Sequence, residues 1–244
     1  MQNNRTLVIG DIHGGFRGLL QLIERVKITP EDLLIFLGDF ADGWSQTPEV
    51  ISYLISLNNT HKCIFLRGNH DTLLLEYLKT NSDNELWKRH GGASTIIAYT
   101  NIDSFVRNEH IQFLEDLEDY YIDQESRLFI HAVFTNLKGV QHEYFNKTFY
   151  WDRTLWETAL ALDKNIQINA LEYPNRFKCY SEIYIGHTPT TRLKLTTPQN
   201  RANIWNIDTG AAYTGKITAL DINSKEYWQS DLLMELYPEE KGRN

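Results

Sequence analysis

The stretch Leu7-Val8-Ile9-Gly10-Asp11-Ile12-His13-Gly14 decides the fold of this chain. Its first three residues are apolar, and the run stops at a glycine. A short apolar run that ends at a turn is typical of a buried strand. Beyond the turn, apolar residues recur at i, i+3, i+4 and i+7, which predicts an amphipathic helix with the positions Phe16, Leu19, Leu20 and Ile23. The stretch therefore predicts a strand, a polar turn and a helix, in that order.

The same unit recurs twice in the next part of the chain. Residues 33–37 and 63–66 are apolar runs that predict buried strands, and they stop at Gly38-Asp39 and at Gly68-Asn69. A helix is predicted after each of them, and Pro48 stands at the start of the first. This alternation of strands and helices is the pattern of an α/β protein. Sheets of this kind bind ligands at the carboxyl ends of their strands, where each unit places its polar residues.

The second half of the chain predicts a less regular continuation. Two further strands, each closed by a histidine, are predicted at residues 127–130 and 183–185. A helix is predicted over residues 158–171. Within residues 203–222, alternating apolar positions predict a pair of strands around the turn Thr209-Gly210-Ala211.

The composition is that of one globular domain. The chain has 244 residues, of which 42% are hydrophobic and 12% aromatic, so a sizeable core can be buried. No linker or internal repeat divides it. We expect a single domain over residues 1–244, with an insertion of helices and loops at about residues 80–125 that packs over the sheet edge.

Charge and hydropathy exclude several classes of protein. A formal net charge of -8 argues against a general nucleic-acid binder, which needs a basic surface. It permits a small phosphorylated substrate, because metal ions can supply positive charge locally. No signal peptide opens the chain, and no apolar stretch approaches the ~20 residues of a membrane span. Cys63 and Cys179 form no metal-binding or disulfide pattern. We therefore expect no membrane association and a cytoplasmic location.

The predicted strand ends carry side chains that suit metal ions. Carboxylates, imidazoles and amide oxygens bind divalent metals such as Mn²⁺, Fe²⁺, Zn²⁺ and Mg²⁺. Two such ions ~3.5–4 Å apart can clamp the attacking and leaving oxygens of an in-line displacement. Any one of these aspartates alone could be a helix N-cap. The recurrence at successive strand ends favours a metal site built from Asp11, His13, Asp39, Asn69, His131 and His187.

Five motifs occur in the order used by the calcineurin-like metallophosphoesterases. The chain most resembles the phosphoprotein phosphatase branch, with its bacterial and phage protein phosphatases and symmetrical diadenosine tetraphosphatases. The resemblance runs from about residue 5 to residue 222. It implies a four-layer αββα sandwich, with two mixed sheets face to face and helices outside. The matching motifs are Gly10-Asp11-Ile12-His13-Gly14, Gly38-Asp39-Phe40-Ala41-Asp42-Gly43, Gly68-Asn69-His70-Asp71, His131 and Gly186-His187-Thr188.

The resemblance also implies a role for each matching residue. Asp39 would bridge two divalent metal ions, with Mn²⁺ expected first and Fe, Zn, Ni, Co or Mg as alternatives. The remaining ligands would be Asp11 and His13 for the first ion, and Asn69, His131 and His187 for the second.

One histidine of the third motif has a different implied role. His70 would not bind metal but would protonate the leaving oxygen, oriented by Asp42. Imidazole can hold and release a proton near neutral pH, and a carboxylate on its other nitrogen fixes the tautomer. The implied reaction is hydrolysis of a phosphomonoester by a hydroxide held between the two metals.

The chain departs from the family pattern at one position. Protein phosphatases usually follow the second motif's aspartate with an arginine that grips the substrate phosphate, and here that residue is Gly43. The remaining candidate is Arg153, in Tyr150-Trp151-Asp152-Arg153, because the planar guanidinium fork suits phosphate. Arg67 is expected only to support the fold. The departure implies weaker phosphate binding or a pocket for a different group.

Three functions follow from this pattern. The first is a protein phosphatase acting on phosphoserine or phosphothreonine, with phosphotyrosine as a further substrate. The second is a nucleotide hydrolase of the diadenosine tetraphosphatase type. The third is a non-catalytic phosphate-binding module, which the complete ligand set argues against. In each case the partner is a phosphorylated molecule.

The remaining histidines and tryptophans favour structural roles. His61, His110 and His142 are expected at the surface or in loops, and for His90 a substrate contact is the alternative to a structural role. Asp208 is expected to be structural or to support the site. The acidic residues from Glu235 onward are expected to be solvated and partly disordered. Core packing is favoured over a substrate pocket for Trp44, Trp87 and Trp151.

Overall fold

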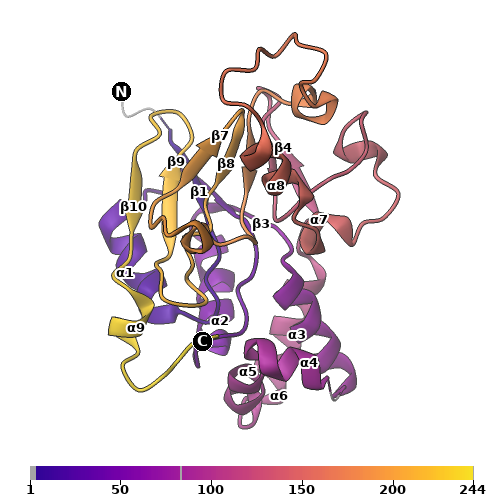
Figure 1. Ribbon diagram of the computed structural model, residues 1–244. Coiled ribbons are helices and arrows are strands. Elements are labelled where there is room, and N and C mark those ends of the chain that lie inside the picture. The colour runs from indigo at the N-terminus through magenta and orange to yellow at the C-terminus, as the bar shows by residue number, and fades with distance from the viewer. Residues whose placement is uncertain (1–3, 83, 244) are drawn as a thin grey trace.

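The computed structural model describes residues 4–82 and 84–243 (Figure 1). In this part of the chain, the strands form two five-stranded sheets, and each sheet is mixed. The first has the order β10-β9-β1-β2-β3, with β1 at Thr6–Ile9, β2 at Leu33–Phe36, β3 at Lys62–Phe65, β9 at Thr218–Asp221 and β10 at Tyr227–Gln229. The second has the order β4-β5-β6-β8-β7, with β4 at Tyr120–Ile122, β5 at Leu128–Ile130, β6 at Ile183–Ile185, β7 at Gln199–Arg201 and β8 at Ile204–Asn206.

The three predicted strand–helix units form the parallel part of the first sheet. β1 pairs with β2, and β2 with β3, all in parallel. Helices α1 (Phe16–Val26) and α2 (Thr47–Asn58) make the two crossovers, and α3 (Asn69–Thr80) follows the third strand. The third strand is present as predicted, but β3 lies at the sheet edge and is only partly buried, so the expectation of a buried strand there was wrong.

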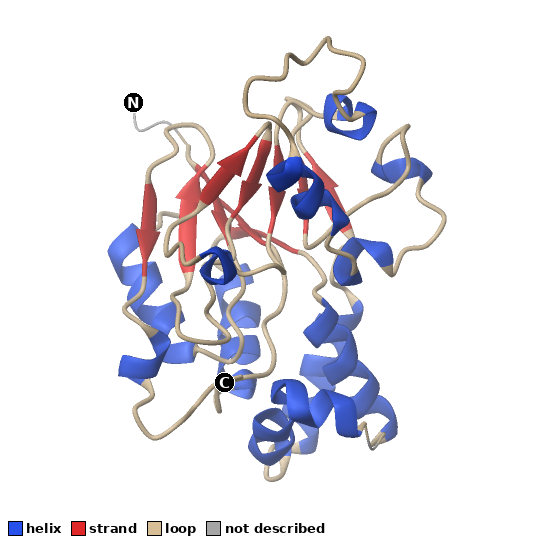
Figure 2. Ribbon diagram, viewed as in Figure 1, coloured by secondary structure: helices blue, strands red, loops and turns tan. Residues whose placement is uncertain are grey.

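Three separate hydrophobic clusters show how the layers stack. Along β1, Leu7 and Ile9 pack against helices α1 to α3, whereas Val8 packs against the second sheet. Along β6, Tyr184 joins Val8 between the sheets, whereas Ile183 packs outward under α8 (Thr154–Ala161). Because alternate strand residues point to opposite faces, each sheet is buried on both sides. The result is helix, sheet, sheet, helix, and Figure 2 shows the helices flanking both sheets.

The segment at residues 80–125 is mostly helical. It contains α4 (Glu85–Trp87), the π-helical turn η1 (Lys88–Gly92), α5 (Ala93–Tyr99) and α6 (Ser104–Glu115). Helices α5 and α6 pack against α2 and α3, within the first helical layer, and Glu118, further along the segment, pairs with Leu66 at the end of the edge strand β3. The segment then returns to the sheets through β4.

Two predicted elements differ from the structure. The helix expected over residues 158–171 ends at Ala161, and the Asp163 carboxylate accepts a hydrogen bond from the Asn165 N–H at 2.9 Å, which competes with helix. The strands expected to pair within residues 203–222 belong to different sheets. β8 pairs with β6 and β7, and β9 pairs with β1 and β10.

His110 is buried and not at the surface as the sequence suggested. Its Nδ1 lies 2.8 Å from the Tyr99 hydroxyl, and its Nε2 lies 2.8 Å from Ser52 Oγ. Burial lowers the pKa of His110 to about 4, from an ordinary value of 6.5. Its charged form is therefore favoured only in the unfolded chain, and the stability that neutral His110 contributes is lost as the pH falls from 6.5 towards 4.

Replacing His110 with Gln should flatten the pH dependence of folding. Between pH 7.5 and pH 5, titration of His110 should remove about 2 kcal/mol from the wild-type free energy of unfolding, a term that the variant lacks. Urea denaturation of both proteins at the two pH values measures this difference. An equal loss in wild type and variant would contradict the assignment, because titrations elsewhere act on both proteins alike.

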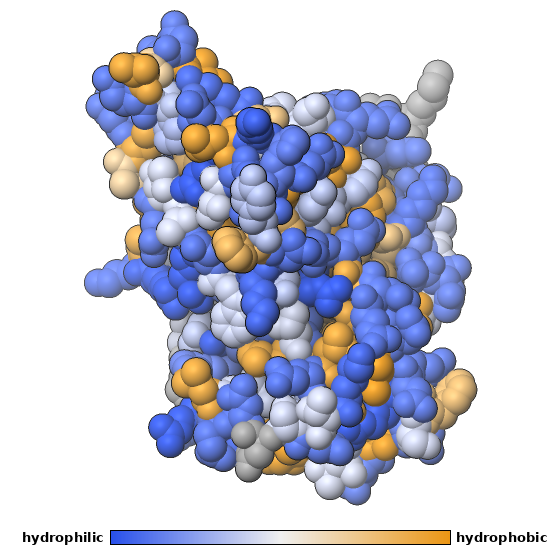
Figure 3. Space-filling model, turned by 90° about the vertical axis from the view of Figure 1, so that its right-hand side faces the viewer, coloured by the Kyte–Doolittle hydropathy of each residue, from blue (hydrophilic) through white to orange (hydrophobic). Residues whose placement is uncertain are grey.

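Among the described residues, no helix is long and apolar enough to cross a membrane. Figure 3 shows one face of the molecule, which is mostly hydrophilic with hydrophobic residues in small separate groups.

Candidate active site

The six predicted metal ligands meet at the carboxyl ends of β1, β2, β3, β5 and β6, and all are buried. Asp39 lies at their centre: its Oδ2 is 3.6 Å from His13 Nε2 and 3.4 Å from His131 Nε2. His13 Nε2 is 3.7 Å from Asp11 Oδ2 on one side. On the other side, His131 Nε2 is 3.2 Å from His187 Nδ1. The set forms a continuous chain of donor atoms around one carboxylate.

Backbone carbonyls orient two of these imidazoles. His13 Nδ1 lies 3.1 Å from the Ala41 oxygen, and His131 Nδ1 lies 2.8 Å from the Leu37 oxygen. Each Nδ1–H can donate to its carbonyl, which leaves Nε2 as an unprotonated donor directed at Asp39. This second contact is the usual way in which proteins fix the tautomer of a metal-binding histidine.

The donor atoms fit divalent cations. Asn69 Oδ1 and His187 Nε2 are buried and have no hydrogen-bond partner among the described residues, which is costly unless another group satisfies them. Burial raises the pKa of Asp11 to about 7, opposed by His131 and reinforced by the charge of Asp39. A cation would relieve both costs. Two groups have donor atoms within 4.8 Å of one another, His13 with Asp39 and His70, and Asp39 with His131 and His187.

Backbone strain is concentrated at this centre. His13, Asp39, Asp42 and His187 have φ angles of 53°, 54°, 73° and 67°. Residues other than glycine rarely adopt this left-handed region, and each instance costs of the order of 1 kcal/mol or more. Four strained residues on three loops, those after β1, β2 and β6, lie at this centre, which is typical of a functional site.

Two glycines allow the carboxylates to approach the neighbouring loops. A Cβ atom at Gly68 would collide with Asp39 Oδ1, and one at Gly186 would collide with Asp11 Oδ1. Any side chain at these positions would displace a donor oxygen.

His70 is held in a buried hydrogen-bond network. Its Nδ1 lies 2.6 Å from Asp42 Oδ2, and its backbone N–H donates to Asp39 Oδ1 at 2.9 Å. Asp42 also accepts hydrogen bonds from Trp87 Nε1 at 2.5 Å and from Thr95 Oγ1 at 2.7 Å. The helical segment therefore fixes the carboxylate that orients His70, so Trp87 and Thr95 support the site from far along the chain.

Asp71 organises the loop that carries Asp39. Its carboxylate accepts backbone hydrogen bonds from Asp39 and Phe40 at 2.8 Å and from Gly68 at 2.9 Å. The loops after β2 and β3 are thus joined through one buried side chain, and Asp39 and Asn69 keep a fixed separation.

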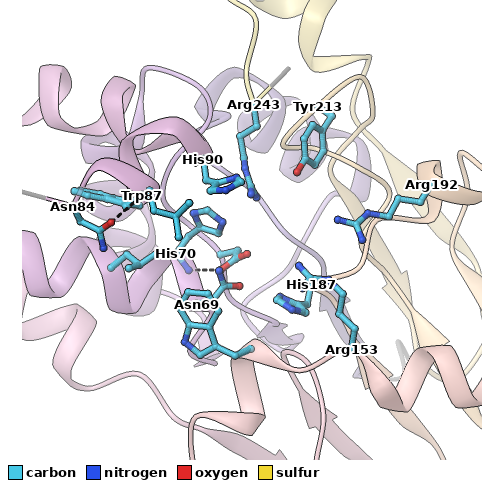
Figure 4. A pocket seen from close by; sticks show the side chains of 14 residues that line it. Asn69, His70, Asn84, Trp87, His90, Arg153, His187, Arg192, Tyr213 and Arg243 are labelled. Atoms are coloured by element: carbon cyan, nitrogen blue, oxygen red, sulfur yellow. Dashed lines mark hydrogen bonds between the residues drawn. The ribbon is translucent and has the colours of Figure 1, made fainter.

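A cavity of ≈ 410 Å³ opens directly above this centre. Asp39, Asn69, His70 and His187 are in its floor, and three arginines converge on it from different loops (Figure 4). Arg153 precedes α8, Arg192 lies in the 3-10 turn η4 (Thr190–Leu193), and Arg243 comes from near the end of the described chain. The other lining residues are Leu73, Asn84, Leu86, Trp87, His90, Trp151 and Tyr213.

Comparison with known proteins places the chain in a family. Residues 4–191 match the model of the calcineurin-like phosphoesterases. The chain belongs to this family. It is a calcineurin-like phosphoesterase, an enzyme that hydrolyses phosphoester bonds, and the resemblance stated from the motifs is confirmed.

The similar enzymes are named either as nucleosyl-tetraphosphatases or as protein phosphatases. An asymmetrical bis(5'-nucleosyl)-tetraphosphatase of Anoxybacillus flavithermus is 28% identical over 234 residues, covering 87% of this chain and 88% of the other. Serine/threonine-protein phosphatase 1 of Salmonella typhimurium is 24% identical over 218 residues, covering 86% and 88%. A crystal structure described as a putative diadenosine tetraphosphatase shares the fold, with a TM-score of 0.63, 18% identity and 93% of each chain covered.

Several predicted positions in this phosphoesterase lie where the sequence suggested. Arg153 and His90 line the cavity. Arg67 lies away from it and donates to Asp119 and to backbone carbonyls, as expected of a supporting residue. Asp208 is buried and accepts a hydrogen bond from the Gly210 N–H at 2.9 Å.

Other expectations about this phosphoesterase were met only in part. Glu235 and Glu239 are exposed as expected, but Tyr237 packs on Trp44 in the core and Arg243 reaches the cavity. Trp44 and Trp87 are buried in the core as expected, although Trp87 also lines the cavity; Trp151 is half-exposed and lines the cavity, so core packing was wrong for it. Arg192, only five residues after His187, could have been sought near that motif. Nothing in the local sequence around Arg243 points to the site.

Proposed function

We propose that this phosphoesterase hydrolyses nucleoside polyphosphates at a centre of two divalent metal ions, with Mn²⁺ the expected metal. The observation that carries the proposal is the group of three arginines in the cavity above the donor atoms. One phosphate monoester offers little charge for three guanidinium groups in addition to two metals. A chain of phosphates carries further negative charge along its length.

The proposed ligands are those that the motifs implied. Asp11 and His13 would hold one ion, Asp39 would bridge, and the second ion would take Asn69, His131 and His187. When bound, two such ions supply Lewis acidity and lower the pKa of water at the centre.

His70 would donate a proton to the leaving oxygen, and Asp42 would orient the His70 imidazole. Asp42 is within hydrogen-bonding distance of His70 Nδ1, so Nε2 is the nitrogen left to donate to a departing oxygen. Because Trp87 and Thr95 fix both oxygens of Asp42, the imidazole is held in one orientation before substrate arrives. Preorganisation of this kind avoids reorganisation during the reaction.

The arginines would bind the phosphates of the substrate. Arg153 has a buried Nε without a hydrogen-bond partner among the described residues. Burial lowers its pKa, and the charges of Arg192 and Arg243 lower it further. The three cations thus repel one another in a partly enclosed space, and a polyanion would relieve that repulsion. Trp151 and Tyr213 offer aromatic faces on which a base could stack.

A protein phosphatase is the second candidate. The Salmonella relative is named as one, and two exposed apolar side chains border the cavity, Leu86 at 67% and Trp151 at 44% exposure. A peptide around phosphoserine could pack its side chains there.

A matched substrate panel tests the proposal. Mn²⁺-loaded enzyme should show a kcat/KM for diadenosine tetraphosphate about 100-fold or more above that for a phosphoserine peptide, because each additional charged hydrogen bond contributes about 1.5–3 kcal/mol. p-Nitrophenyl phosphate and its bis-ester serve as controls for the chemistry alone. The reverse preference would favour the protein phosphatase, and no turnover of any ester would contradict both.

A further inference from the structure

The last described residues, 237–243, cross the edge of the cavity. We call this segment the strap. Figure 1 shows this yellow segment looping back from α9 (Leu233–Leu236) towards the middle of the molecule. Tyr237 stacks on Trp44 with ring centroids 5.2 Å apart. Glu240 accepts hydrogen bonds from the Ser45 N–H at 2.9 Å and from its hydroxyl at 2.7 Å. The strap is therefore anchored to the loop that follows Asp42.

At the end of the strap, the aliphatic part of the Arg243 side chain packs against Gly43 and Gly91. A Cβ atom added at Gly91 would lie 2.8 Å from Arg243 Cγ, and one added at Gly43 would lie 3.5 Å from it. The Arg243 N–H donates to the Ala212 oxygen at 2.8 Å, which fixes the backbone. Gly43 is the position where the family pattern has an arginine, so the space beside that backbone is filled by an arginine from the strap.

The head of Arg243 points into the cavity (Figure 4). Its guanidinium carbon lies 5.2 Å from the centre of the Tyr213 ring, a cation–π contact that limits its freedom. Its Nε is buried and has no hydrogen-bond partner among the described residues. Its charge also lowers the pKa of Arg153, so both side chains share one electrostatic environment. A positioned guanidinium group whose Nε is buried and unsatisfied is suited to an anion.

We propose that Arg243 is a substrate-binding residue that grips phosphate from the strap, in place of a side chain at position 43. Because Arg243 reaches the cavity only when the strap is anchored, substrate affinity depends on contacts such as Ser45 with Glu240. The inference rests on the proposed function only in that the substrate carries phosphate, and it holds for a nucleotide or a phosphopeptide.

The test measures phosphate binding apart from turnover. Binding of inorganic phosphate to Mn²⁺-loaded protein is followed by calorimetry, together with KM for the best substrate. Arg243→Ala should weaken phosphate binding and raise KM by about 10- to 100-fold, since a charged hydrogen bond contributes about 1.5–3 kcal/mol. Arg243→Lys keeps the charge without the planar fork and should recover only part of the loss. Arg201→Ala, on β7 away from the cavity, is the matched control and should change neither value.

A second variant tests whether substrate affinity depends on the anchoring of the strap. Glu240→Ala removes the two hydrogen bonds between the strap and Ser45 without altering any cavity residue, and should raise KM by about 3- to 10-fold, because Tyr237 and the Arg243 N–H still hold the strap. Phosphate should also slow hydrogen exchange of the strap in wild type but not in Arg243→Ala. Equal phosphate affinity in wild type and Arg243→Ala, or no phosphate binding by wild type, would overturn the inference. Phosphate binding that depends on Arg243, without turnover of any ester, would refute the proposed function alone.

Discussion

Replacing His70 with Asn is expected to lower kcat for a phosphoserine peptide by about 10²- to 10⁴-fold, the usual contribution of a positioned general acid. The serine oxygen is a basic leaving group and needs a proton as its bond to phosphorus breaks. His70 Nε2 is the candidate donor because Nδ1 lies 2.6 Å from Asp42. Steady-state kinetics and the metal content of each protein measure the effect, and the variant should still bind two ions.

The choice of leaving group supplies the control for His70. p-Nitrophenolate is a stable anion that departs without protonation. His70→Asn should therefore lose far less activity on p-nitrophenyl phosphate than on the phosphoserine peptide, which is an alkyl ester. Asp42→Asn should show the same selective loss, since the amide cannot favour the same tautomer. Equal losses on both esters, or loss of a metal ion, would show that His70 acts as a ligand or in substrate binding and not as an acid.

Replacing Asp39 with Asn is expected to abolish the paired metal site and to lower kcat/KM by about 10³-fold or more, because metal ions contribute several kcal/mol to transition-state stabilisation. The Asp39 carboxylate lies between His13 and His131 and is the shared member of both donor groups. An amide at this place offers one neutral oxygen and cannot bridge two cations equally. Metal analysis should find fewer than two Mn²⁺ ions per chain.

Asp32→Asn is the matched control for Asp39→Asn. Asp32 is also buried, but it pairs with Arg5 at 2.6 Å and does not line the cavity. Loss of this ion pair in Asp32→Asn should lower the free energy of unfolding and leave the metal content and the kinetics unchanged. Retention of two ions and of activity by Asp39→Asn would remove Asp39 from the bridging position.

The candidate metal ligands and the α/β class could be proposed from the sequence because their signals are local. Each candidate ligand stands within a few residues of an apolar run, and the run itself predicts a strand whose carboxyl end must lie at the edge of a sheet. Asp11 and Asp39 were therefore found without knowledge of the packing. The two sheets were expected only through the family resemblance, because strand alternation does not say which strands share a sheet. β8 and β9 illustrate this, since they follow one another closely and yet join different sheets.

The supporting residues could not be predicted, because their roles depend on contacts between distant parts of the chain. Only the packing of α5 and α4 shows that Thr95 and Trp87 contact Asp42. His110 looked like a surface residue because its hydroxyl partners, Ser52 and Tyr99, lie on other helices. A side chain's environment is set by neighbours in space, and short-range sequence carries little of that information.

The sequence by itself determined the chemistry of the centre, and the tertiary structure decided what surrounds it. A strand, a tight turn and the ligand are coded within a dozen residues, because backbone sterics and side-chain burial act over that range. The cavity combines Arg153, Arg192 and Arg243 with Trp87, and these come from four separate segments. Their meeting depends on how two sheets and a strap pack as a whole. For that reason Gly43 was visible in the sequence as a missing arginine, whereas Arg243 became visible only in the fold.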